Sequence, residues 1–565
     1  MTDQPRKPPI PTFRIGVMCT GKALPAWQAQ VLESLLEVPG VEISLLIGPE
    51  SKGSGSKLAT LAGDPKHLVW NFYNKIFVQR RSSASRSVDM NPQLAGVPEI
   101  WCSTEPVGKY AERFSDDDLA AIRGFNLDVI LRFAFGILKG PILESARYGI
   151  WSFHHGDERE YRGQPPGFWE VVEGQSTVGT ILQRITERLD GGTVLHRGRF
   201  KVTPHSYRRT RDGAFLGAVD FPSIEVRRIM AGDTSAVEAD PSTTTAPLRR
   251  SPGNWTMAMF FARQFLAFLR SQWIGLGRAS MWTIGVIDRP VTDLLDEDPI
   301  DVAWVPEQGA SRYLADPFPD PTGKTSFVLA EDYDHVSHRG VISAIDLDGK
   351  GQPEVVLDTG VHASYPYLFE HGGSVFCVPE TYQARQVRIY RATSFPDRWE
   401  LADTILDGLP VLDPTVFQHE GRWWLFCTLE GSHANTALHV FHAQQLSGPW
   451  VPHNLNPVKT DISSSRPGGT PFVHDGALYR PAQDSSASYG GAIAINEVEV
   501  LTPNEFSERV VRRIGPLTSG PYRAGIHTIA GRGGLTVVDG RRDAFIFSSF
   551  RREFAGRIRQ VLKRG

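Results

Sequence analysis

The sequence of 565 residues predicts two domains of different class, an α/β domain built on a parallel sheet and, after it, an all-β five-bladed propeller. Two observations predict this. Strand-like and helix-like segments alternate through residues 13–200, and a strand-rich motif recurs five times beyond residue 299. A chain of this length also exceeds what one hydrophobic core ordinarily holds, so two or more domains are expected.

The first domain begins with an alternation of strand and helix. Residues 13–20 (FRIGVMCT) and 41–48 (VEISLLIG) predict buried strands, and residues 23–38 (ALPAWQAQVLESLLEV) predict an amphipathic helix between them. A second helix is expected at 116–125 and another buried strand at 127–135. This alternation is typical of a parallel sheet with helices on both faces, in which sites form at the carboxyl ends of the strands.

Residues 151–170 (WSFHHGDEREYRGQPPGFWE) are rich in titratable side chains and follow an apolar run at 128–143 (DVILRFAFGILKGPIL). If that run contains a strand of the parallel sheet, this segment lies where active sites of such sheets are built. It is therefore the first candidate site.

The repeats of the second domain each combine an apolar strand, a glycine turn and another strand, and the fifth is degenerate. Their spacing is about 50 residues, as in propeller blades. The residues that mark the five repeats are Pro317, Pro366, Pro414, Pro471 and His527.

The region between the domains predicts a linker at 233–254, followed by an apolar helical segment at 255–279 that is interrupted by Arg263 and Arg270. This segment is either a helix lying in a membrane interface or a connecting helix packed against a domain, and we favour the second. The predicted boundaries are a disordered tail at 1–12, the α/β domain at 13–204, a helical and linker region at 205–298, the propeller at 299–552 and a basic tail at 553–565.

Composition excludes several functions. The formal net charge of −3 predicts no general affinity for nucleic acid or anionic membranes. The sequence contains no uninterrupted apolar run of about 18 residues, so no membrane span is expected. No glycine-rich phosphate loop follows the first strand, which disfavours a nicotinamide cofactor. No signal peptide is evident, and the cysteines are dispersed without a CxxC pair, so a cytoplasmic protein without a metal site is expected. The four cysteines are Cys19, Cys102, Cys377 and Cys427.

Three segments of the first domain together resemble the folate-dependent formyltransferases, which act on methionyl-tRNA, glycinamide ribonucleotide or sugar amines. They are DVILRFAFGILKGPIL, GIWSFHHGDEREYRG and VGTILQRITERLDGGTVL, in the family's order. The resemblance implies a Rossmann-like fold and 10-formyltetrahydrofolate as formyl donor. It also implies that the pterin is held by the loop of Phe135, Gly136, Ile137 and Leu138.

The same resemblance places His154 on the family's catalytic histidine and Asp190 on its catalytic aspartate. An amine that attacks the formyl carbon needs a hydrogen-bond donor for the developing oxyanion and an acceptor for its proton. A histidine can supply the donor, and a carboxylate can accept or relay the proton and also orient the imidazole. The structural alternative is a histidine satisfied at a strand end and an aspartate in a turn.

The family's asparagine is replaced here by Ser152, which has one donor where the amide has two. Loss of one oxyanion donor costs about 2.7–4 kcal/mol of transition-state stabilisation. Either His155 or Asp157 takes over part of this role, or catalysis is slow, or the domain only binds its ligands.

The second domain resembles the five-bladed glycoside hydrolases (arabinanases, xylosidases and invertases) and the N-terminal domain of plant glucosamine inositolphosphorylceramide transferases. In the hydrolases, carboxylates from successive blades meet in a central funnel. Asp316 matches the nucleophile or base, Asp413 matches a second carboxylate, and Glu380 is a further candidate. Arg466 stands where the hydrolases have an acid glutamate, and His527 could join a charged pocket. Each Asp-Pro could instead be only a turn.

The sequence thus predicts formyl transfer to an amine, carried by an amino sugar or nucleotide-linked sugar, with a propeller that binds or processes the glycan. No nucleic-acid partner is expected, because no basic domain follows the first one. One alternative is a glycosidase or glycosyl transferase in the propeller beside a degenerate formyltransferase domain. Another is a non-catalytic protein that binds folate and glycan. The oligomeric state is left open.

Overall fold

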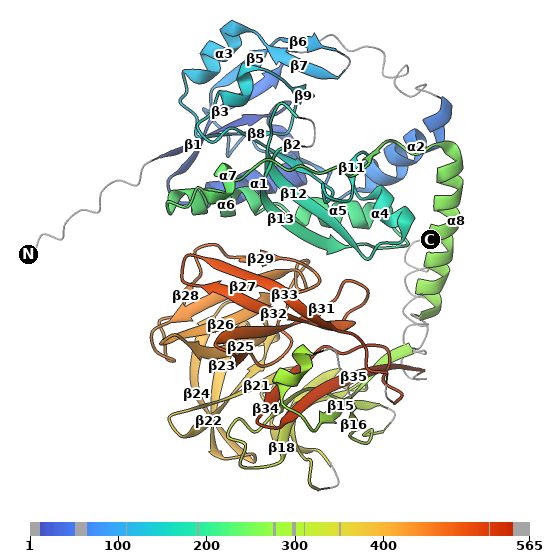
Figure 1. Cartoon of the computed structure of the whole chain (residues 1–565), viewed down its shortest axis with the longest axis vertical. Coiled ribbons are helices and arrows are strands. Elements are labelled where there is room, and N and C mark those ends of the chain that lie inside the picture. The colour runs from blue at the N-terminus through green and yellow to red at the C-terminus, as the bar shows by residue number, and fades with distance from the viewer. Residues whose placement is uncertain are drawn as a thin grey trace, which may run out of the picture. The chain divides into compact units, whose positions relative to one another are not determined.

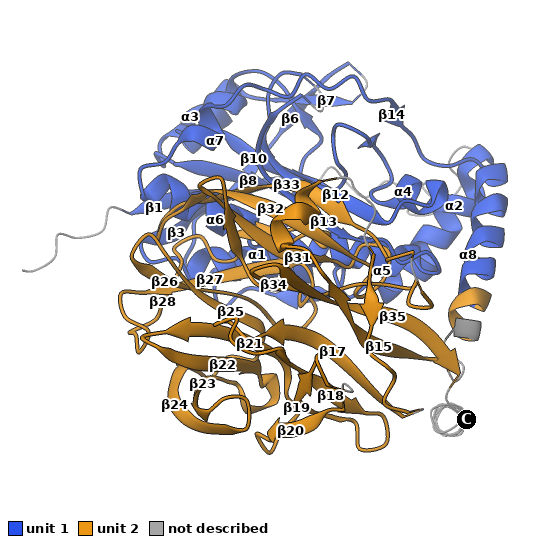
Figure 2. Ribbon diagram, turned by 60° about the horizontal axis from the view of Figure 1, so that its bottom comes forward, with its two compact units in different colours: residues 1–268 blue, residues 269–565 orange. Residues whose placement is uncertain are grey.

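The computed structural model consists of two compact units, residues 1–268 and residues 269–565 (Figures 1 and 2). The ranges it describes are 12–50, 65–108, 110–188, 191–274, 278–296, 301–309, 311–349, 352–518 and 520–545. The two predicted tails, apart from residue 12, lie outside these residues.

Unit 1 is built on a seven-stranded sheet. In spatial order its strands are β13 (Thr193–Lys201), β12 (Thr177–Arg184), β10 (Ile150–His154), β8 (Val129–Arg132), β1 (Phe13–Met18), β3 (Val41–Pro49) and β5 (Glu99–Cys102). The five strands from β10 to β5 are parallel, and β12 and β13 complete the sheet in antiparallel orientation. The predicted α/β fold is confirmed.

Helices cover both faces of this sheet (Figure 1). The helices of the described residues up to 274 are α1 (Ala26–Leu36), α2 (Leu68–Tyr73), α3 (Asp116–Arg123), α4 (Phe168–Glu173), α5 (Tyr207–Gly217), α6 (Phe221–Met230), α7 (Ser235–Glu238) and α8 (Asn254–Ile274). Short strands β2 (Ala23–Pro25), β4 (Ser87–Asp89), β6 (Thr104–Val107), β7 (Ala111–Phe114), β9 (Ile137–Leu138), β11 (Arg162–Gly163) and β14 (Leu248–Arg249) form the remaining pairs. The helix expected at 23–38 begins at Ala26, because the residues before it pair as β2 with β4.

The region predicted as helical and linker sequence belongs largely to the core of unit 1. Tyr207 and Phe215 of α5 and Phe221 of α6 are buried in the larger hydrophobic cluster, together with residues of α1 and β1. Even the predicted linker at 233–254 contributes β14, which pairs with β11. Apolar helix faces that pack on a sheet explain why this segment does not separate two domains.

Unit 2 is a five-bladed propeller, as predicted. The first blade consists of β17 (Arg312–Pro319), β18 (Phe327–Asp334), β19 (Arg339–Asp346) and β20 (Glu354–Leu357). The second consists of β21 (Ser364–His371), β22 (Ser374–Glu380), β23 (Gln386–Ser394) and β24 (Arg398–Asp407). The third is β25 (Val411–His419), β26 (Arg422–Leu429), β27 (Ala437–Ala443) and β28 (Val451–Pro452), with β29 (Lys459–Thr460) also paired to β27. The fourth is β30 (Phe472–His474), β31 (Ala477–Asp484), β32 (Ala492–Leu501) and β33 (Phe506–Ile514).

The fifth blade joins the two ends of the propeller sequence. It contains β34 (Ile529–Arg532), β35 (Leu535–Phe545), β15 (Arg278–Ile287) and β16 (Ala303–Trp304). β15 pairs with β35 from Arg278 opposite Phe545 to Ile287 opposite Thr536. The propeller therefore begins before the predicted boundary at 299, because β15, which lies between β35 and β16 in this blade, comes from the segment that follows α8.

Three innermost strands have the same backbone irregularity at the same place. Asp316, Tyr365 and Asp413 have φ angles of 50°, 45° and 48°, and each precedes a proline. In each strand the pairing register breaks at this point. A left-handed conformation is uncommon outside glycine, although aspartate tolerates it, and for tyrosine it is exceptional.

Glu170 of α4 is expected to make the stability of unit 1 depend on pH. Its side chain is 2% exposed, and burial, followed by the charge of Glu173, raises its pKa from 4.5 to about 7. Because the folded state holds this proton more tightly, the free energy of unfolding should fall as pH rises from about 4.5 to about 7, by about 3 kcal/mol at most. Glu170→Gln should remove this fall, measured by chemical denaturation at successive pH values.

The exposed Glu33→Gln is the matched control and should keep the pH dependence of the parent. A Glu170→Gln variant that is less stable than the parent at pH 8 would contradict the assignment.

Candidate active sites

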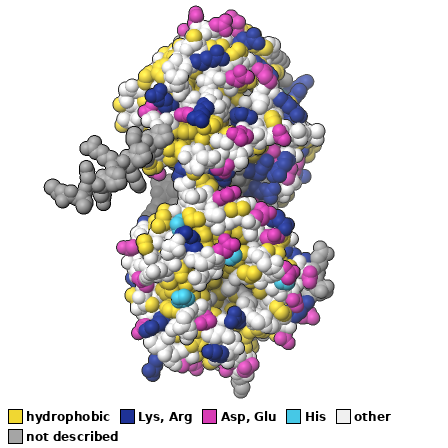
Figure 3. Space-filling model, turned by 60° about the vertical axis from the view of Figure 1, so that its left-hand side comes forward, with side chains coloured by type: hydrophobic (Ala, Val, Ile, Leu, Met, Phe, Trp, Pro, Cys, Tyr) yellow, Lys and Arg dark blue, Asp and Glu magenta, His cyan; other side chains and the backbone are white. Residues whose placement is uncertain are grey.

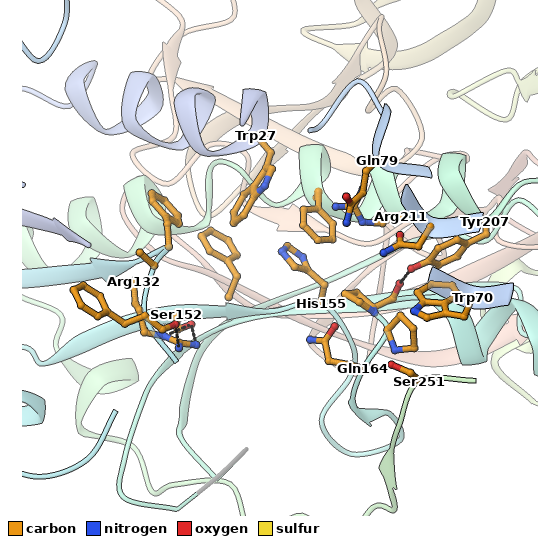
Figure 4. Close-up of a pocket in the computed structure, with 18 residues that line it drawn as sticks. Trp27, Trp70, Gln79, Arg132, Ser152, His155, Gln164, Tyr207, Arg211 and Ser251 are labelled. Atoms are coloured by element: carbon orange, nitrogen blue, oxygen red, sulfur yellow. Dashed lines mark hydrogen bonds between the residues drawn. The ribbon is translucent and has the colours of Figure 1, made fainter. Parts of the chain in front are cut away.

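The first candidate site is a cavity of about 400 Å³ in unit 1, at the carboxyl ends of β8 and β10 (Figure 4). Its aromatic lining consists of Trp27, Trp70, Phe133, Phe135, Phe153, Tyr207 and Phe215. Its polar lining consists of Asn74, Gln79, Arg132, Ser152, His155, Gln164, Arg211 and Ser251. Of the residues selected from the sequence, Ser152, His155 and Phe135 line it.

Arg132, the last residue of β8, stands at one end of this cavity beside Ser152 (Figure 4). Its Nε and Nη2 donate to Ser152 Oγ at 3.2 and 3.0 Å. Its Nη1 donates to the carbonyls of Phe135 and Gly136, so the guanidinium also fixes the loop after β8. Burial lowers the pKa of Arg132, opposed by the charge of Glu112. The sequence analysis missed this residue, whose only signal was a cation at the end of a buried strand.

His155 occupies the middle of the cavity (Figure 4) and is held by aromatic rings. Its ring stacks on Phe215 with centroids 3.6 Å apart and meets Trp27 edge-on at 5.3 Å. Neither ring nitrogen has a hydrogen-bond partner among the described residues. Burial, with the nearby His154 and Arg211, lowers its pKa well below 6.5, so the ring is neutral at pH 7. It therefore presents one unpaired donor and one unpaired acceptor.

His154 is not among the described residues that line this cavity. Its Nε2 lies 3.0 Å from the carbonyl oxygen of Tyr161. Because a carbonyl can only accept, Nε2 carries a proton in this contact, and Nδ1 is the ring nitrogen that could act as an acceptor. Asp190, the expected partner of His154, lies outside the described residues.

The four residues expected to hold the pterin differ in their surroundings. Phe135 lines the cavity with a φ of 68°. The amide nitrogen of Gly136 donates to Glu112 Oε1 at 3.0 Å. Ile137 and Leu138 form β9, and Leu138 is buried in the smaller core cluster. Only the first part of this loop faces the cavity with a side chain.

Asp157 is one of two residues expected to substitute for the amide that Ser152 lacks, but its carboxylate is already hydrogen-bonded. Its oxygens accept hydrogen bonds from Arg159 and Arg197. Burial opposes its charge, but these guanidinium groups outweigh it and lower the pKa of Asp157 to about 2. It is a structural carboxylate, outside the described cavity lining.

The second candidate site is a pocket of about 420 Å³ at the centre of the propeller. The structure brings the five predicted funnel residues together. Asp316, Glu380, Asp413 and Arg466 line the pocket, and His527 contacts Asp316. Residues that the sequence analysis did not select also line it, among them Trp282, Tyr313, Glu331, Tyr333, His335, His362 and Tyr489.

One side of this pocket is a buried ion-pair network. Arg466 donates to Asp413 through Nε at 2.5 Å and Nη2 at 3.2 Å, and Gln483 adds a hydrogen bond of 2.7 Å. Glu380 accepts from the amide nitrogen of Asp413 at 2.9 Å and lies 3.8 Å from Arg466. Burial and the charge of Asp413 raise the pKa of Glu380 well above its usual range, so it retains a proton at neutral pH.

The opposite side is a buried chain of two aspartates and a histidine. His527 lies between Asp539, 2.5 Å from Nδ1, and Asp316, 3.5 Å from Nε2. Burial opposes charge on His527, but the two carboxylates outweigh it and raise its pKa. Burial raises the pKa of Asp316 to about 6. These three side chains offer oxygen and nitrogen atoms within 4.8 Å of one another, so within the described residues they could also hold a cation.

Glu331 is a further carboxyl group of the pocket that the sequence analysis missed. Burial, then the charges of Asp316 and Glu380, raises its pKa well above 4.5. It is the blade 1 counterpart of Glu380, because it pairs with Ala315 as Glu380 pairs with Ser364. This shared position relative to the Asp-Pro and Tyr-Pro dipeptides is the signal that could have found it.

Comparison with known proteins agrees with the division into two units. Residues 298–515 match the family model described as glucosamine inositolphosphorylceramide transferase 1, N-terminal, which covers less than half of the chain. The enzyme of that name from Oryza sativa subsp. japonica is 31% identical over 269 residues, 45% of this chain and 34% of the relative. The one from Arabidopsis thaliana is 35% identical over 207 residues, 35% of this chain and 27% of the relative.

A different class of enzyme matches elsewhere. The methionyl-tRNA formyltransferase of Agathobacter rectalis is 34% identical over 84 residues, 15% of this chain and 27% of the relative. The chain thus spans about a third or less of the length of these curated relatives. It joins a formyltransferase-like α/β unit to a propeller similar to the N-terminal domain of the plant transferases.

Proposed function

We propose that unit 1 transfers a formyl group from 10-formyltetrahydrofolate to an amine, and that the amine belongs to an amino sugar or a nucleotide-linked sugar. The observation that carries this proposal is the half-buried Arg132, which is held by Ser152 at the carboxyl ends of two parallel strands and faces an aromatic cavity. Similarity to methionyl-tRNA formyltransferases supports the reaction class.

The cavity suits a flat, polar donor that carries carboxylate groups. Trp27, Phe133 and Phe135 provide aromatic walls, and Arg211 provides a cation for an anionic tail. The unpaired nitrogens of His155 can bond to polar edges of a heterocycle. When bound, the donor supplies its N10-formyl group to the amine.

Within this reaction, Arg132 and Ser152 donate hydrogen bonds to the negative charge that develops on the formyl oxygen. The guanidinium thereby takes the place of the amide that the formyltransferases have at the position of Ser152. The proposed role of His154, whose Nε2 is bonded to Tyr161, is to accept the proton of the amine at Nδ1, and it rests on the sequence resemblance because the side chain lies outside the cavity lining. The proposed role of Asp190, to orient His154 or relay that proton, rests on the sequence resemblance alone.

The propeller pocket is proposed to bind the glycan part of the acceptor. Its carboxyl groups accept hydrogen bonds from hydroxyls, and the Arg466 guanidinium donates them. The rings of Trp282 and Tyr313 supply apolar faces for the sugar ring. In this proposal Asp413 and Arg466 shape the pocket, because their charges satisfy each other.

Arg132→Gln is expected to lower kcat for formyl transfer by about 100-fold to 1000-fold, because it removes an oxyanion donor. Binding of 5-formyltetrahydrofolate, an unreactive analogue of the donor, should change little when measured by calorimetry. The exposed Arg147→Gln is the control and should retain parental activity. Equal kcat for the Arg132→Gln variant and the parent would assign the guanidinium a structural role.

His155→Phe is expected to raise thermal stability while weakening the binding of 5-formyltetrahydrofolate by about tenfold. The substitution removes two buried polar atoms that lack partners, each costing about 1–3 kcal/mol, and with them two groups available to the ligand. Thermal melts and calorimetric titration of the same preparation measure both effects. Unchanged affinity would show that the donor does not contact this ring.

A second candidate function is cleavage or transfer of glycosyl groups in the propeller pocket. It is favoured by Asp316 and Glu331, two carboxyl groups on one pocket whose pKa values are both raised, Glu331 more strongly. Such a pair can combine an ionised base with a protonated acid.

If this second function is correct, Asp316→Asn should abolish turnover of glycosides and leave formyl transfer unchanged. Hydrolysis of nitrophenyl glycosides and formylation of amino sugars, assayed on the same protein, separate the two activities. Asp348→Asn, which lies in the exposed turn after β19, is the control. Glycoside turnover that survives Asp316→Asn would contradict this function.

A further inference from the structure

The helix α8 exposes far more apolar surface than a helix of a globular protein ordinarily does. Met257 and Phe260 are buried against unit 1. Trp255 is 76% exposed, Phe265 60% and Leu266 64%. With the 3.6-residue period of the helix, the exposed apolar residues form one broad arc, and Arg263 and Arg270 lie seven residues apart at its edge. The expectation of a connecting helix packed against a domain therefore holds for one narrow face only.

A second exposed apolar surface adjoins this arc. Leu68 and Phe72 of α2 and Phe77 of the following π-helical turn (Asn74–Val78) are each about half exposed. Tyr73 connects the two elements, since its ring lies 6.0 Å from Phe77 and 5.3 Å from Phe261 of α8. We call this surface the aromatic face and define it as Leu68, Phe72, Phe77, Trp255, Met259, Phe261, Phe265, Leu266 and Phe268.

The two segments that form the aromatic face contain no acidic residue. None occurs in residues 65–88 or in residues 241–287. The exposed cations of these segments within unit 1 include Lys66, Lys75, Arg80, Arg81, Arg86 and Arg263. By contrast, the face of the molecule drawn in Figure 3 carries both acidic and basic side chains, with apolar side chains among them. The net charge of −3 therefore does not describe this region.

We propose that the aromatic face docks unit 1 onto the surface of an anionic lipid bilayer. Exposed Trp, Phe and Leu side chains flanked by cations match the boundary between acyl chains and acidic headgroups. Among the described residues no helix is both long and apolar enough to cross a membrane. Docking does not depend on the proposed formyl transfer, although α2 also supplies Trp70, and the π-helical turn after it Asn74, to the cavity of unit 1.

The test is flotation of the full chain with vesicles of phosphatidylcholine, either alone or mixed with phosphatidylglycerol. The parent should float with the mixed vesicles and much less with phosphatidylcholine alone. The double variant Phe265→Glu/Leu266→Glu should partition about tenfold or more weakly, because it loses two inserted apolar side chains and gains charge. Lys75→Gln/Arg80→Gln should weaken binding to the mixed vesicles by about fivefold for each cation removed.

The matched control is Val336→Glu/Leu401→Glu, which changes two apolar side chains of unit 2 that are 70% and 55% exposed. It should bind vesicles like the parent. Equal binding by this control and the Phe265→Glu/Leu266→Glu variant would overturn the proposal, as would a parent that binds neither vesicle. If the parent is a dimer that does not bind vesicles, and the Phe265→Glu/Leu266→Glu variant is a monomer, the aromatic face would instead be a surface for self-association.

Discussion

The centre of the propeller depends on a backbone constraint in its innermost strands. Asp316, Tyr365 and Asp413 adopt left-handed conformations before prolines, and the strand pairing breaks at each of them. In a regularly pleated strand, successive side chains point to opposite faces of the sheet. The irregularity instead places two aspartates on the central pocket and lets Tyr365 donate or accept hydrogen bonds across to Thr415 and Gly469.

Carboxyl groups gathered in this way must be neutralised, because burying unpaired charge is costly. The propeller does so in three ways. Arg466 pairs with Asp413, His527 stands between two aspartates, and Glu331 and Glu380 retain their protons. The cavity of unit 1 contains a half-buried guanidinium, a neutral histidine and many aromatic rings. A carboxyl-rich pocket suits hydroxyl groups, whereas an aromatic and cationic one suits a flat anionic ligand.

The sequence predicted the two folds because both depend on local patterns. Alternation of strand and helix indicates a parallel sheet, and the recurrence of Asp-Pro or Tyr-Pro before glycine turns indicates blades. It did not predict the fifth blade correctly, since the pairing of β15 with β35 joins residues far apart in the chain. It selected Asp413 and Arg466 through the resemblance to the glycoside hydrolases, but it missed Asp539 and Arg132. The partners of these two residues lie in other parts of the chain, and no sequence spacing indicates those contacts.

The pairing of β15 with β35 also has a consequence for biosynthesis. Ribosomes release the chain from its N-terminus, so unit 1 is complete while much of the propeller is still untranslated. The first strand of the propeller to emerge, β15, has to wait for the last long strand before its blade can form. Until then its edge stays open to other strands, and a nascent chain cut short before residue 535 would expose that edge permanently. Closure of the ring therefore becomes possible only after almost all of the propeller has been translated.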